Sequence, residues 1–218
     1  MKQYKYLLFD LDGTVADNSE GVCKSFEYAL NYYGIKVESL DELSPVIGPP
    51  LIDSFMDMYS FSEEKAVEAV AKYRERYADT GIFECLIYPG MDKLFESLTG
   101  RGYKIVLATS KPEVFARRIL DHFNLSKYFH FIAGAEIGGK ISKKEEVIRH
   151  ILDSLNITDV SQCLMIGDRK FDLIGAEHFG MDAMGVLYGF GDLEELSSYP
   201  NVGIAETVED MARIIVSL

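Results

Sequence analysis

Short apolar runs alternate with amphipathic segments along this chain, and this alternation constrains its fold more than any other feature. Each run has the length of a buried strand, and the segments between the runs carry apolar residues three or four positions apart, the spacing of one helix face. Strands that alternate with helices predict a parallel sheet covered on both faces. The expected fold class is therefore α/β, with a doubly wound, Rossmann-like parallel sheet. The runs cover residues 4–9, 104–108 and 163–167, with weaker runs at 131–133, 183–187 and 202–205.

Two of the expected helices have recognisable starts. Ser142 and Glu145 form an S-x-x-E capping box ahead of an apolar stripe, and Thr207 with Asp210 opens the last helix. These signals predict one helix between the weaker 131–133 run and the 163–167 strand, and another after the 202–205 run.

The alternation breaks between the first strand and the second. Residues 21–33 and 66–78 have helical spacing, with Ser62 at an N-cap position and Gly81 where a C-cap belongs, while residues 47–51 form a Gly-Pro-Pro turn. We therefore expect a small α-helical domain inserted into the α/β core. The expected division is residues 17–84 for the insertion and residues 1–16 and 85–218 for the core.

The charge balance excludes some classes of partner. The chain has 35 acidic and 22 basic residues and a formal net charge of −13. Because phosphate backbones and anionic lipids are bound by clustered Lys and Arg, we expect neither a nucleic-acid nor a membrane partner. No apolar run is long enough for a signal peptide or a membrane span, which makes the cytoplasm the expected location.

The cysteines point the same way. Cys23, Cys85 and Cys163 are odd in number and lack C-x-x-C spacing. This pattern predicts buried thiols in a reducing compartment rather than disulfides or a zinc site.

Two carboxylates stand where the first apolar strand ends. Asp10 and Asp12 lie two residues apart, directly before Gly13. Ligands of doubly wound sheets bind beyond the carboxyl ends of the strands, so this pair indicates a site for a hard cation, a nucleophile with a partner acid, or both. The alternative is a polar turn broken by Gly13.

Polar residues follow two more strands in the same way. Thr109 and Ser110 come after the 104–108 strand, where hydroxyl and backbone N–H groups ahead of a helix suit a phosphate. Asp168 and Asp172 follow the 163–167 strand, four residues apart, a spacing that puts both on one side if a helix begins there. A phosphate site so rich in aspartate needs a cation, and Lys140, Lys143 and Lys144 are the candidates.

Together these motifs resemble those of the haloacid dehalogenase-like (HAD) hydrolase superfamily. The D-L-D-G-T at 10–14, the Thr-Ser pair, a lysine and the G-D-x-x-x-D at 167–172 stand in family order. The helical insertion resembles the small α-helical cap of subfamily I. Within the superfamily the chain is most similar to phosphoglycolate phosphatase-like proteins, through residues 47–51, 109–112 and 185–191 among others.

The resemblance implies a role for each acid. Asp10 would be the nucleophile that forms an aspartyl-phosphate, and Asp12 the general acid and then the general base. Asp10, the backbone carbonyl of Asp12, and Asp168 would hold Mg²⁺, with Asp172 as an additional acid near the metal or its waters.

The same resemblance assigns the phosphate contacts. Thr109 and the Ser110 amide would bind the phosphoryl oxygens. The lysine would offset the charge of Asp10 and of the phosphate; Lys144 is favoured over Lys143, and Lys140 comes third, because the family's lysine stands just ahead of an E-V-I-like helix start.

The expected function is that of a Mg²⁺-dependent phosphatase that hydrolyses a small phosphorylated metabolite, similar to phosphoglycolate phosphatase. Asp12 argues against carbon–halogen cleavage, because the dehalogenases of the family lack this acid. The alternatives are a 5′-nucleotidase acting on nucleoside monophosphates, a sugar phosphomutase and, outside the enzymes, a regulatory phosphoacceptor module. The substrate, the cap residues that contact it and the choice between monomer and homodimer are left open.

Overall fold

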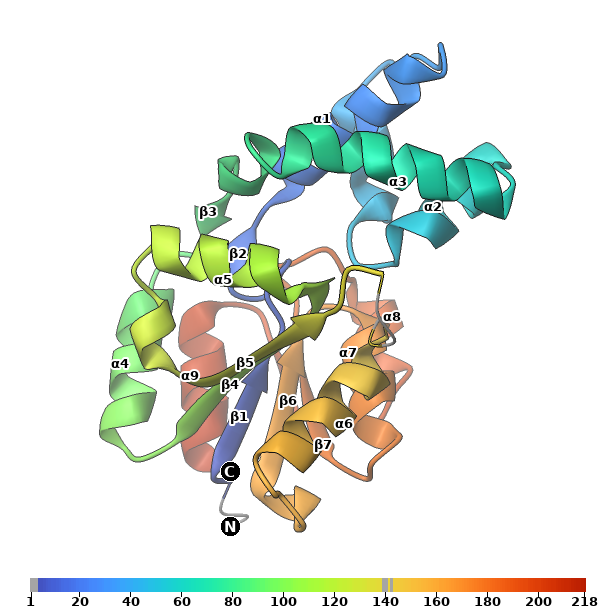
Figure 1. Ribbon diagram of the computed structural model, residues 1–218. Coiled ribbons are helices and arrows are strands. Elements are labelled where there is room, and N and C mark those ends of the chain that lie inside the picture. The colour runs from blue at the N-terminus through green and yellow to red at the C-terminus, as the bar shows by residue number, and fades with distance from the viewer. Residues whose placement is uncertain (1–3, 139–140, 142) are drawn as a thin grey trace. The chain divides into compact units, whose positions relative to one another are not determined.

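The computed structural model describes residues 4–138, 141 and 143–218. The chain divides into two compact units: Asp17–Leu86 forms one, and the segments Met1–Ala16 and Ile87–Leu218 together form the other. Strands β2 (Ala16–Asp17) and β3 (Leu86–Ile87) pair as a two-stranded sheet, and the boundary between the units falls within both strands (Figure 1).

The larger unit contains a six-stranded sheet in the order β5-β4-β1-β6-β7-β8. All its paired strands run parallel, and β1 lies in the middle with Leu8 opposite Val106 on one side and Met165 on the other. The predicted α/β fold with a parallel sheet is confirmed. The strands are β1 (Tyr6–Phe9), β4 (Lys104–Pro112), β5 (Phe129–Ala135), β6 (Cys163–Gly167), β7 (Asp182–Val186) and β8 (Ile204–Ala205).

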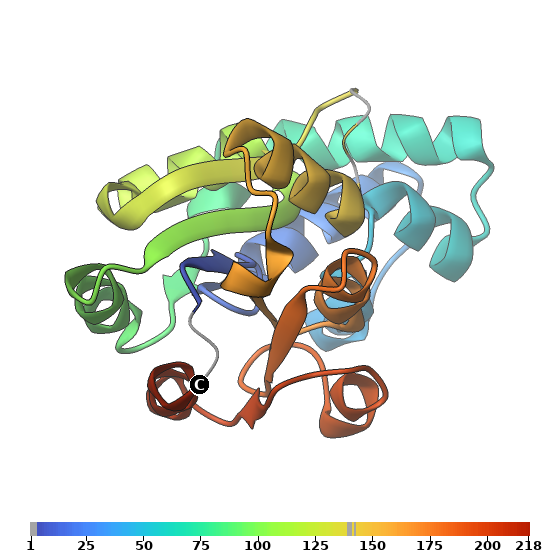
Figure 2. The ribbon, with the colours of Figure 1, turned by 90° about the horizontal axis from the view of Figure 1, so that it is seen from below.

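Helices cover both faces of this sheet (Figure 2). On one face α6, α7 and α8 pack on a core that includes Leu8, Val106 and Met165. On the other face α4 lies beside α9, and Phe95 of α4 packs edge to face on Phe9 with ring centroids 5.2 Å apart. Strand β1 is therefore buried on both sides, which is why it reads as an uninterrupted apolar run. The helices are α4 (Met91–Gly100), α5 (Glu113–His122) on β4 and β5, α6 (Lys144–Ser154), α7 (Lys170–Glu177), α8 (Leu193–Ser197) and α9 (Val208–Ser217), with short 3₁₀ turns at Ser126–Tyr128 and Val160–Gln162.

Two local features of this unit differ from the sequence predictions. Strand β4 continues to Pro112, so Thr109 and Ser110 lie within its irregular end, where the pairing register with β5 shifts, rather than beyond the strand. At the start of α6 the capping acid is Glu146, one residue later than predicted, whose Oε2 accepts a hydrogen bond from the Lys143 N–H at 2.9 Å. The predicted capping residue Ser142 lies outside the described residues. The Thr207 cap of α9 is present, with its Oγ1 accepting from the Asp210 N–H at 3.1 Å.

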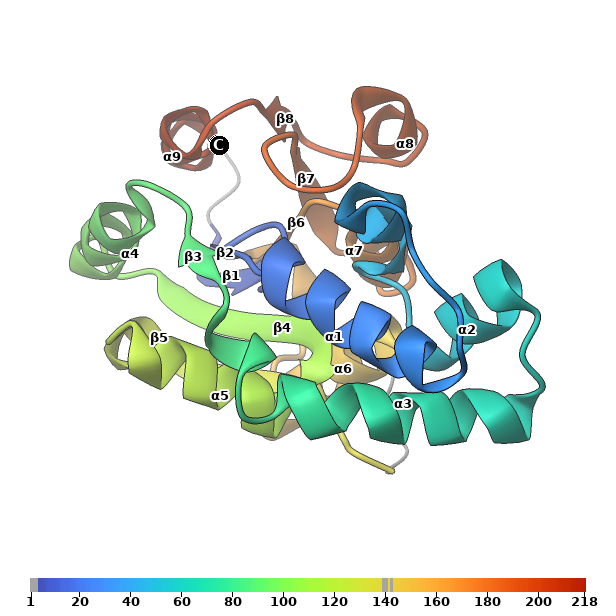
Figure 3. The same cartoon turned by 90° about the horizontal axis from the view of Figure 1, so that it is seen from above.

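The smaller unit is helical, and α1 and α3 lie side by side in it (Figure 3). Its core is aromatic: Phe26 of α1 stacks on Phe55 of α2 with centroids 4.0 Å apart, and Phe61 follows at 5.8 Å from Phe55. Ser62 caps α3 as predicted, its Oγ accepting from the Lys65 N–H at 3.3 Å. The helices are α1 (Ser19–Tyr32), α2 (Leu51–Tyr59) and α3 (Glu63–Tyr77), with 3₁₀ segments at Leu40–Val46 and Gly81–Phe83.

The expectation that Gly81 ends a helix as its C-cap is wrong. Helix α3 ends at Tyr77 with Ala78 as its C-cap, and Gly81 opens the following 3₁₀ turn. Gly81 instead allows this turn to pass close to α1, because a Cβ added to Gly81 would lie 2.8 Å from the Gly21 carbonyl oxygen. A Cβ added to Gly21 would in turn lie 1.9 Å from the Gly81 carbonyl oxygen. The two glycines are therefore needed for a close backbone approach within this unit.

The three cysteines are buried and free, as the sequence predicts. Across the part of the chain that the structure describes, no helix combines the length and the apolar character that crossing a bilayer requires.

Candidate active site

Three aspartates meet at the carboxyl end of the central strands. Asp10 follows β1, Asp168 follows β6, and Asp172 lies in the first turn of α7. Each offers one carboxylate oxygen, and these oxygens lie within 4.8 Å of one another. The meeting follows from the topology, because β1 and β6 are parallel neighbours whose ends share one edge, and the Asp10 N–H still donates to the Ile166 carbonyl at 2.9 Å.

The aspartates of this edge differ in exposure. Asp168 and Asp172 are buried at 0 % and 1 % exposure, whereas the side chains of Asp10 and Asp12 keep 13 % and 17 %. An incoming molecule can therefore touch Asp10 and Asp12, whereas the side chains of Asp168 and Asp172 are buried.

Lys144 connects two of the carboxylates. Its Nζ lies 2.8 Å from Asp10 Oδ1 and 2.8 Å from Asp172 Oδ1, and it donates to the Ala108 carbonyl at 2.7 Å. Burial lowers the pKa of Lys144, but the two carboxylates outweigh burial and raise it, so the ammonium stays charged. Of the other candidate lysines, Lys143 is exposed at the N-cap of α6, and Lys140 lies outside the described residues.

The negative charge of the cluster exceeds what Lys144 neutralises. Burial raises the pKa of Asp168 well above its ordinary value, and the neighbouring charges of Asp172 and Asp10 raise it further. Burial also raises the pKa of Asp172, with Lys144 opposing the change. Crowded carboxylate oxygens without nitrogen or sulfur donors match the ligand preference of a hard divalent cation, so these residues fit Mg²⁺.

Asp12 has a cationic partner that the sequence analysis did not assign. Lys111 Nζ lies 2.9 Å from Asp12 Oδ2, and Lys111 is buried at 8 % exposure. The sequence did contain a signal for this ion pair. Lys111 lies at the end of a buried strand, and a lysine buried there requires an ion-pair partner.

Thr109 adjoins the cluster through its neighbour Ala108, whose carbonyl accepts from Lys144. Thr109 is buried at 1 % exposure, and its Oγ1 accepts a hydrogen bond from the Lys111 N–H at 3.2 Å. Its hydroxyl hydrogen remains able to donate, whereas Ser110 is half-buried beside it.

Asp168 is held by two hydrogen bonds from distant segments. Thr14 Oγ1 donates to Oδ1 at 3.3 Å, and the Phe190 N–H donates to Oδ2 at 2.8 Å. Gly13 adopts φ +83°, and a Cβ added there would lie 2.1 Å from Asp168 Oδ2. Gly13 is therefore more than a turn residue, because it leaves the space that the Asp168 carboxylate occupies.

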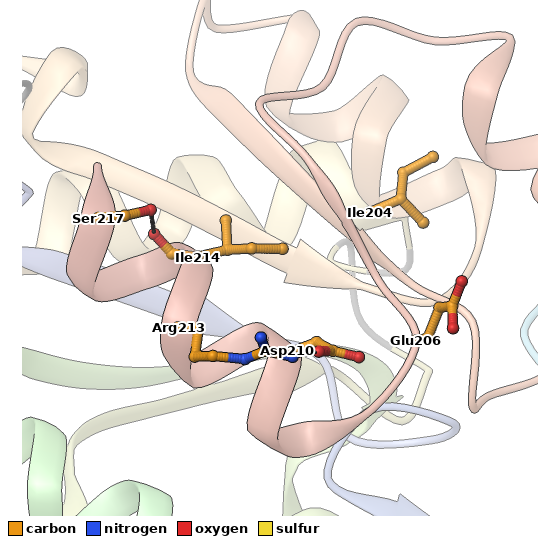
Figure 4. Close-up of a pocket in the computed structure, with 6 residues that line it drawn as sticks. All are labelled: Ile204, Glu206, Asp210, Arg213, Ile214 and Ser217. Carbon is orange, nitrogen blue, oxygen red and sulfur yellow. Dashed lines mark hydrogen bonds and ion pairs between the residues drawn. The ribbon is translucent and has the colours of Figure 1, made fainter.

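A separate groove lies at the edge of the sheet, between β8 and α9 (Figure 4). It contains none of the residues of the carboxylate cluster, and its Arg213 is already paired with Asp210 of the same helix. Its lining residues are Ile204, Glu206, Asp210, Arg213, Ile214 and Ser217.

Known proteins are similar to this chain along nearly its whole length. A 5′-nucleotidase of Pseudomonas aeruginosa is 47 % identical over 197 residues, which cover 90 % of this chain and 89 % of that protein. A phosphoglycolate phosphatase of Vibrio parahaemolyticus is 23 % identical over 219 residues, which cover 97 % of this chain and 96 % of that protein. The crystal structure of a predicted phosphatase from Clostridium acetobutylicum superposes with a TM-score of 0.96 at 45 % identity, over 99 % of this chain and 100 % of that one. The model of the haloacid dehalogenase-like hydrolases matches residues 7–186, and the chain belongs to that family.

Proposed function

We propose that this protein is a Mg²⁺-dependent phosphatase that hydrolyses a small phosphate monoester through an aspartyl-phosphate on Asp10. One observation carries the proposal: the partly exposed Asp10 carboxylate lies against the Lys144 ammonium and beside two fully buried aspartates. A nucleophilic carboxylate needs this combination, because it must reach the substrate while a cationic surrounding accepts the charge of the phosphoryl group.

The two chemical steps divide between Asp10 and Asp12. Asp10 attacks phosphorus, the ester oxygen leaves with a proton from Asp12, and water then cleaves the aspartyl-phosphate after giving a proton to Asp12. Lys111 Nζ lies 2.9 Å from Asp12 Oδ2 and would offset the negative charge that Asp12 carries once it has given its proton to the leaving group. Thr109 and the Ser110 N–H bind phosphoryl oxygens, and Lys144 offsets their charge together with that of Asp10.

Asp10, the Asp12 carbonyl, Asp168 and Asp172 would hold the Mg²⁺ ion. When bound, the ion would neutralise the crowded carboxylates and the phosphoryl oxygens. The rise in the pKa of Asp168 caused by burial and by its acidic neighbours supports this assignment, since a bound cation relieves that unfavourable crowding.

The two units take different roles in this proposal. Residues 1–16 and 85–218 would form the catalytic core, and residues 17–84 would form the α-helical cap that selects the leaving group. The division of the chain at residues 16/17 and 86/87 supports this assignment.

We infer that the substrate is a nucleoside 5′-monophosphate in preference to phosphoglycolate, although the sequence motifs favour the latter. The support is the identity of 47 % to a protein named 5′-nucleotidase, twice that to the phosphoglycolate phosphatase. Such a free metabolite is consistent with action in the cytoplasm and without nucleic acid or membrane as a partner.

Phosphate release across a panel of phosphomonoesters tests the proposal. With Mg²⁺ we expect turnover that EDTA abolishes, and the Asp10→Asn variant should lose it while remaining folded. The exposed Asp92→Asn variant is the matched control in the same unit. Full activity in excess chelator would contradict the metal, and activity of Asp10→Asn would contradict the nucleophile.

The same panel separates the other functions. Isomerisation of hexose 1-phosphates would identify a mutase, and a long-lived aspartyl-phosphate without steady-state phosphate release would identify a phosphoacceptor module. Preference for phosphoglycolate over nucleoside monophosphates would overturn the substrate assignment alone.

A further inference from the structure

We propose that Glu195 is a positioning residue for the metal site: its carboxylate holds the loop between Asp168 and Asp172 so that both acids are placed before the cation arrives. This inference rests on the proposed function, because it presumes that the two aspartates bind Mg²⁺. Glu195 itself lies on α8 and belongs to none of the motifs on which the family assignment rests.

The Glu195 carboxylate binds both residues that follow Asp168. Its Oε1 accepts from the Arg169 Nε at 2.9 Å and from the Lys170 backbone N–H at 2.7 Å, and the guanidinium makes a longer second contact to Oε2 at 3.5 Å. One acidic side chain therefore fixes the chain at two successive positions, the N-cap and the first residue of α7.

The clamped residues are connected directly to the two acids. Arg169 follows Asp168, and its backbone N–H donates to Asp172 Oδ2 at 3.2 Å. Lys170 is the first residue of α7, whose third residue is Asp172. Displacement of residues 169–170 would therefore change the distance between the two carboxylates.

The segment that leads to Glu195 also encloses Asp168. The Phe190 N–H donates to its Oδ2, and a Cβ added to Gly191 would lie 1.9 Å from the Asp168 carbonyl oxygen. Residues 190–195 thus touch the carboxylate, the carbonyl and the following two residues of the metal loop.

Glu195 is itself well anchored, which a clamp requires. Asp192 Oδ1 accepts from the Glu195 N–H at 2.8 Å, and the next residue, Leu196, is fully buried in the core against the sheet. The Glu195 and Arg169 side chains are 21 % and 16 % exposed, so their ion pair is partly removed from solvent and is screened less than a surface pair.

The contacts of Glu195 oppose the electrostatic repulsion among the three aspartates. Asp168, Asp172 and Asp10 lie within 4.8 Å of one another and Lys144 offsets only part of their charge, so without a metal ion these carboxylates repel one another. If the loop relaxed in response, binding of Mg²⁺ would have to reverse that relaxation. Outer partners that orient metal ligands contribute about 10- to 100-fold to metal affinity in general, and we expect a loss in this range without Glu195.

The test measures Mg²⁺ binding to the full chain by calorimetry and by the shift of the thermal unfolding midpoint on addition of MgCl₂. Glu195→Ala should weaken binding by about 10- to 100-fold. Glu195→Gln keeps an acceptor for the Lys170 N–H but loses the ion pair, so its loss should be smaller. The neighbouring Glu194→Ala, whose side chain is exposed on the same helix, should bind Mg²⁺ as the wild type does.

A kinetic readout separates positioning from general destabilisation. At saturating MgCl₂ the Glu195→Ala variant should regain kcat with an unchanged KM for p-nitrophenyl phosphate, which a merely damaged fold would not do. Unchanged Mg²⁺ affinity in a folded Glu195→Ala or Glu195→Gln variant overturns the inference. Absence of Mg²⁺ binding in the wild type would instead overturn the proposed function.

Discussion

Replacing Lys144 by methionine removes the cation between two carboxylates and leaves the shape of the side chain nearly unchanged. Asp10 and Asp172, each 2.8 Å from the Lys144 Nζ, would then face each other with no cation between them when no metal is bound. At least one of them is expected to take up a proton, because an unpaired buried carboxylate raises its pKa rather than remain charged.

The size of the effect follows from that protonation. Keeping one carboxyl with an unfolded pKa of about 3.9 neutral at pH 7 costs about 1.4 kcal/mol for each of about 3 pH units, or about 4 kcal/mol. Removing one partner of a buried ion pair in other proteins lowers the free energy of unfolding by about 3–5 kcal/mol, which agrees with this figure. Typical domains are stable by about 5–15 kcal/mol, and the variant should still fold.

The pH dependence has a definite sign. A carboxyl whose pKa is higher in the folded state than in the unfolded state binds its proton in the folded state first, so the free energy of unfolding falls as the pH rises between the two pKa values. Asp168 and Asp172 already have raised pKa values, and the wild type should show part of this trend in EDTA. In Lys144→Met the deficit should grow from about 1.5 kcal/mol at pH 5 to about 4 kcal/mol at pH 7.

Urea unfolding in EDTA, followed by circular dichroism because the chain has no tryptophan, measures this deficit. Lys143→Met is the matched control, since it makes the same replacement one residue earlier at an exposed position. Equal stability of the two variants at pH 7, or a deficit that does not change with pH, would refute the reasoning.

Three further outcomes are expected. Asp12→Asn should slow the first step, release of the alcohol in a single turnover, by about 10²- to 10⁴-fold with an alkyl phosphate but much less with p-nitrophenyl phosphate, because nitrophenolate leaves without a proton; equal losses in this first step with the two esters would rule out the acid role. Gly21→Ala should destabilise the smaller unit by about 1–3 kcal/mol or more in thermal unfolding, because its Cβ would lie 1.9 Å from the Gly81 carbonyl oxygen; a wild-type midpoint would contradict the close approach. Burial raises the pKa of the Cys163 thiol to about 12 and that of Cys23 to about 11, so at pH 8 both should react with a disulfide reagent orders of magnitude more slowly in the native protein than in urea; rapid labelling without denaturant would show that they are accessible.

Much of the fold and of the site could be predicted because both depend on local pattern. The β1 run is apolar at every position, since both faces are covered, and such runs mark central strands of a parallel sheet. Once the strands are parallel, residues that follow them must share one edge. Asp10 and Asp168 were therefore expected at one place, although 158 positions of sequence separate them.

The sequence predictions were wrong where a residue that is typical of one local structure is needed for a contact with a distant segment. Gly81 reads as a helix terminator because glycine is common there, but its carbonyl lies against Gly21 of another helix. Thr109 was expected just after the end of its strand, yet β4 continues past it, because its pairing with β5 resumes after a register shift. Both contacts involve segments distant in the sequence, so the residues near Gly81 and near Thr109 do not indicate them.

The sequence by itself determined which chemical groups follow each strand: acids after β1 and β6, and hydroxyls at the end of β4. Only the tertiary structure decided which partners those groups have. Lys144 rather than Lys143 reaches Asp10, Lys111 pairs with Asp12, and Glu195 holds the loop beside Asp168. The physical reason is that an ion pair requires its two atoms within about 4 Å, a condition on position and rotamer that distant segments satisfy only after the sheet has brought them together.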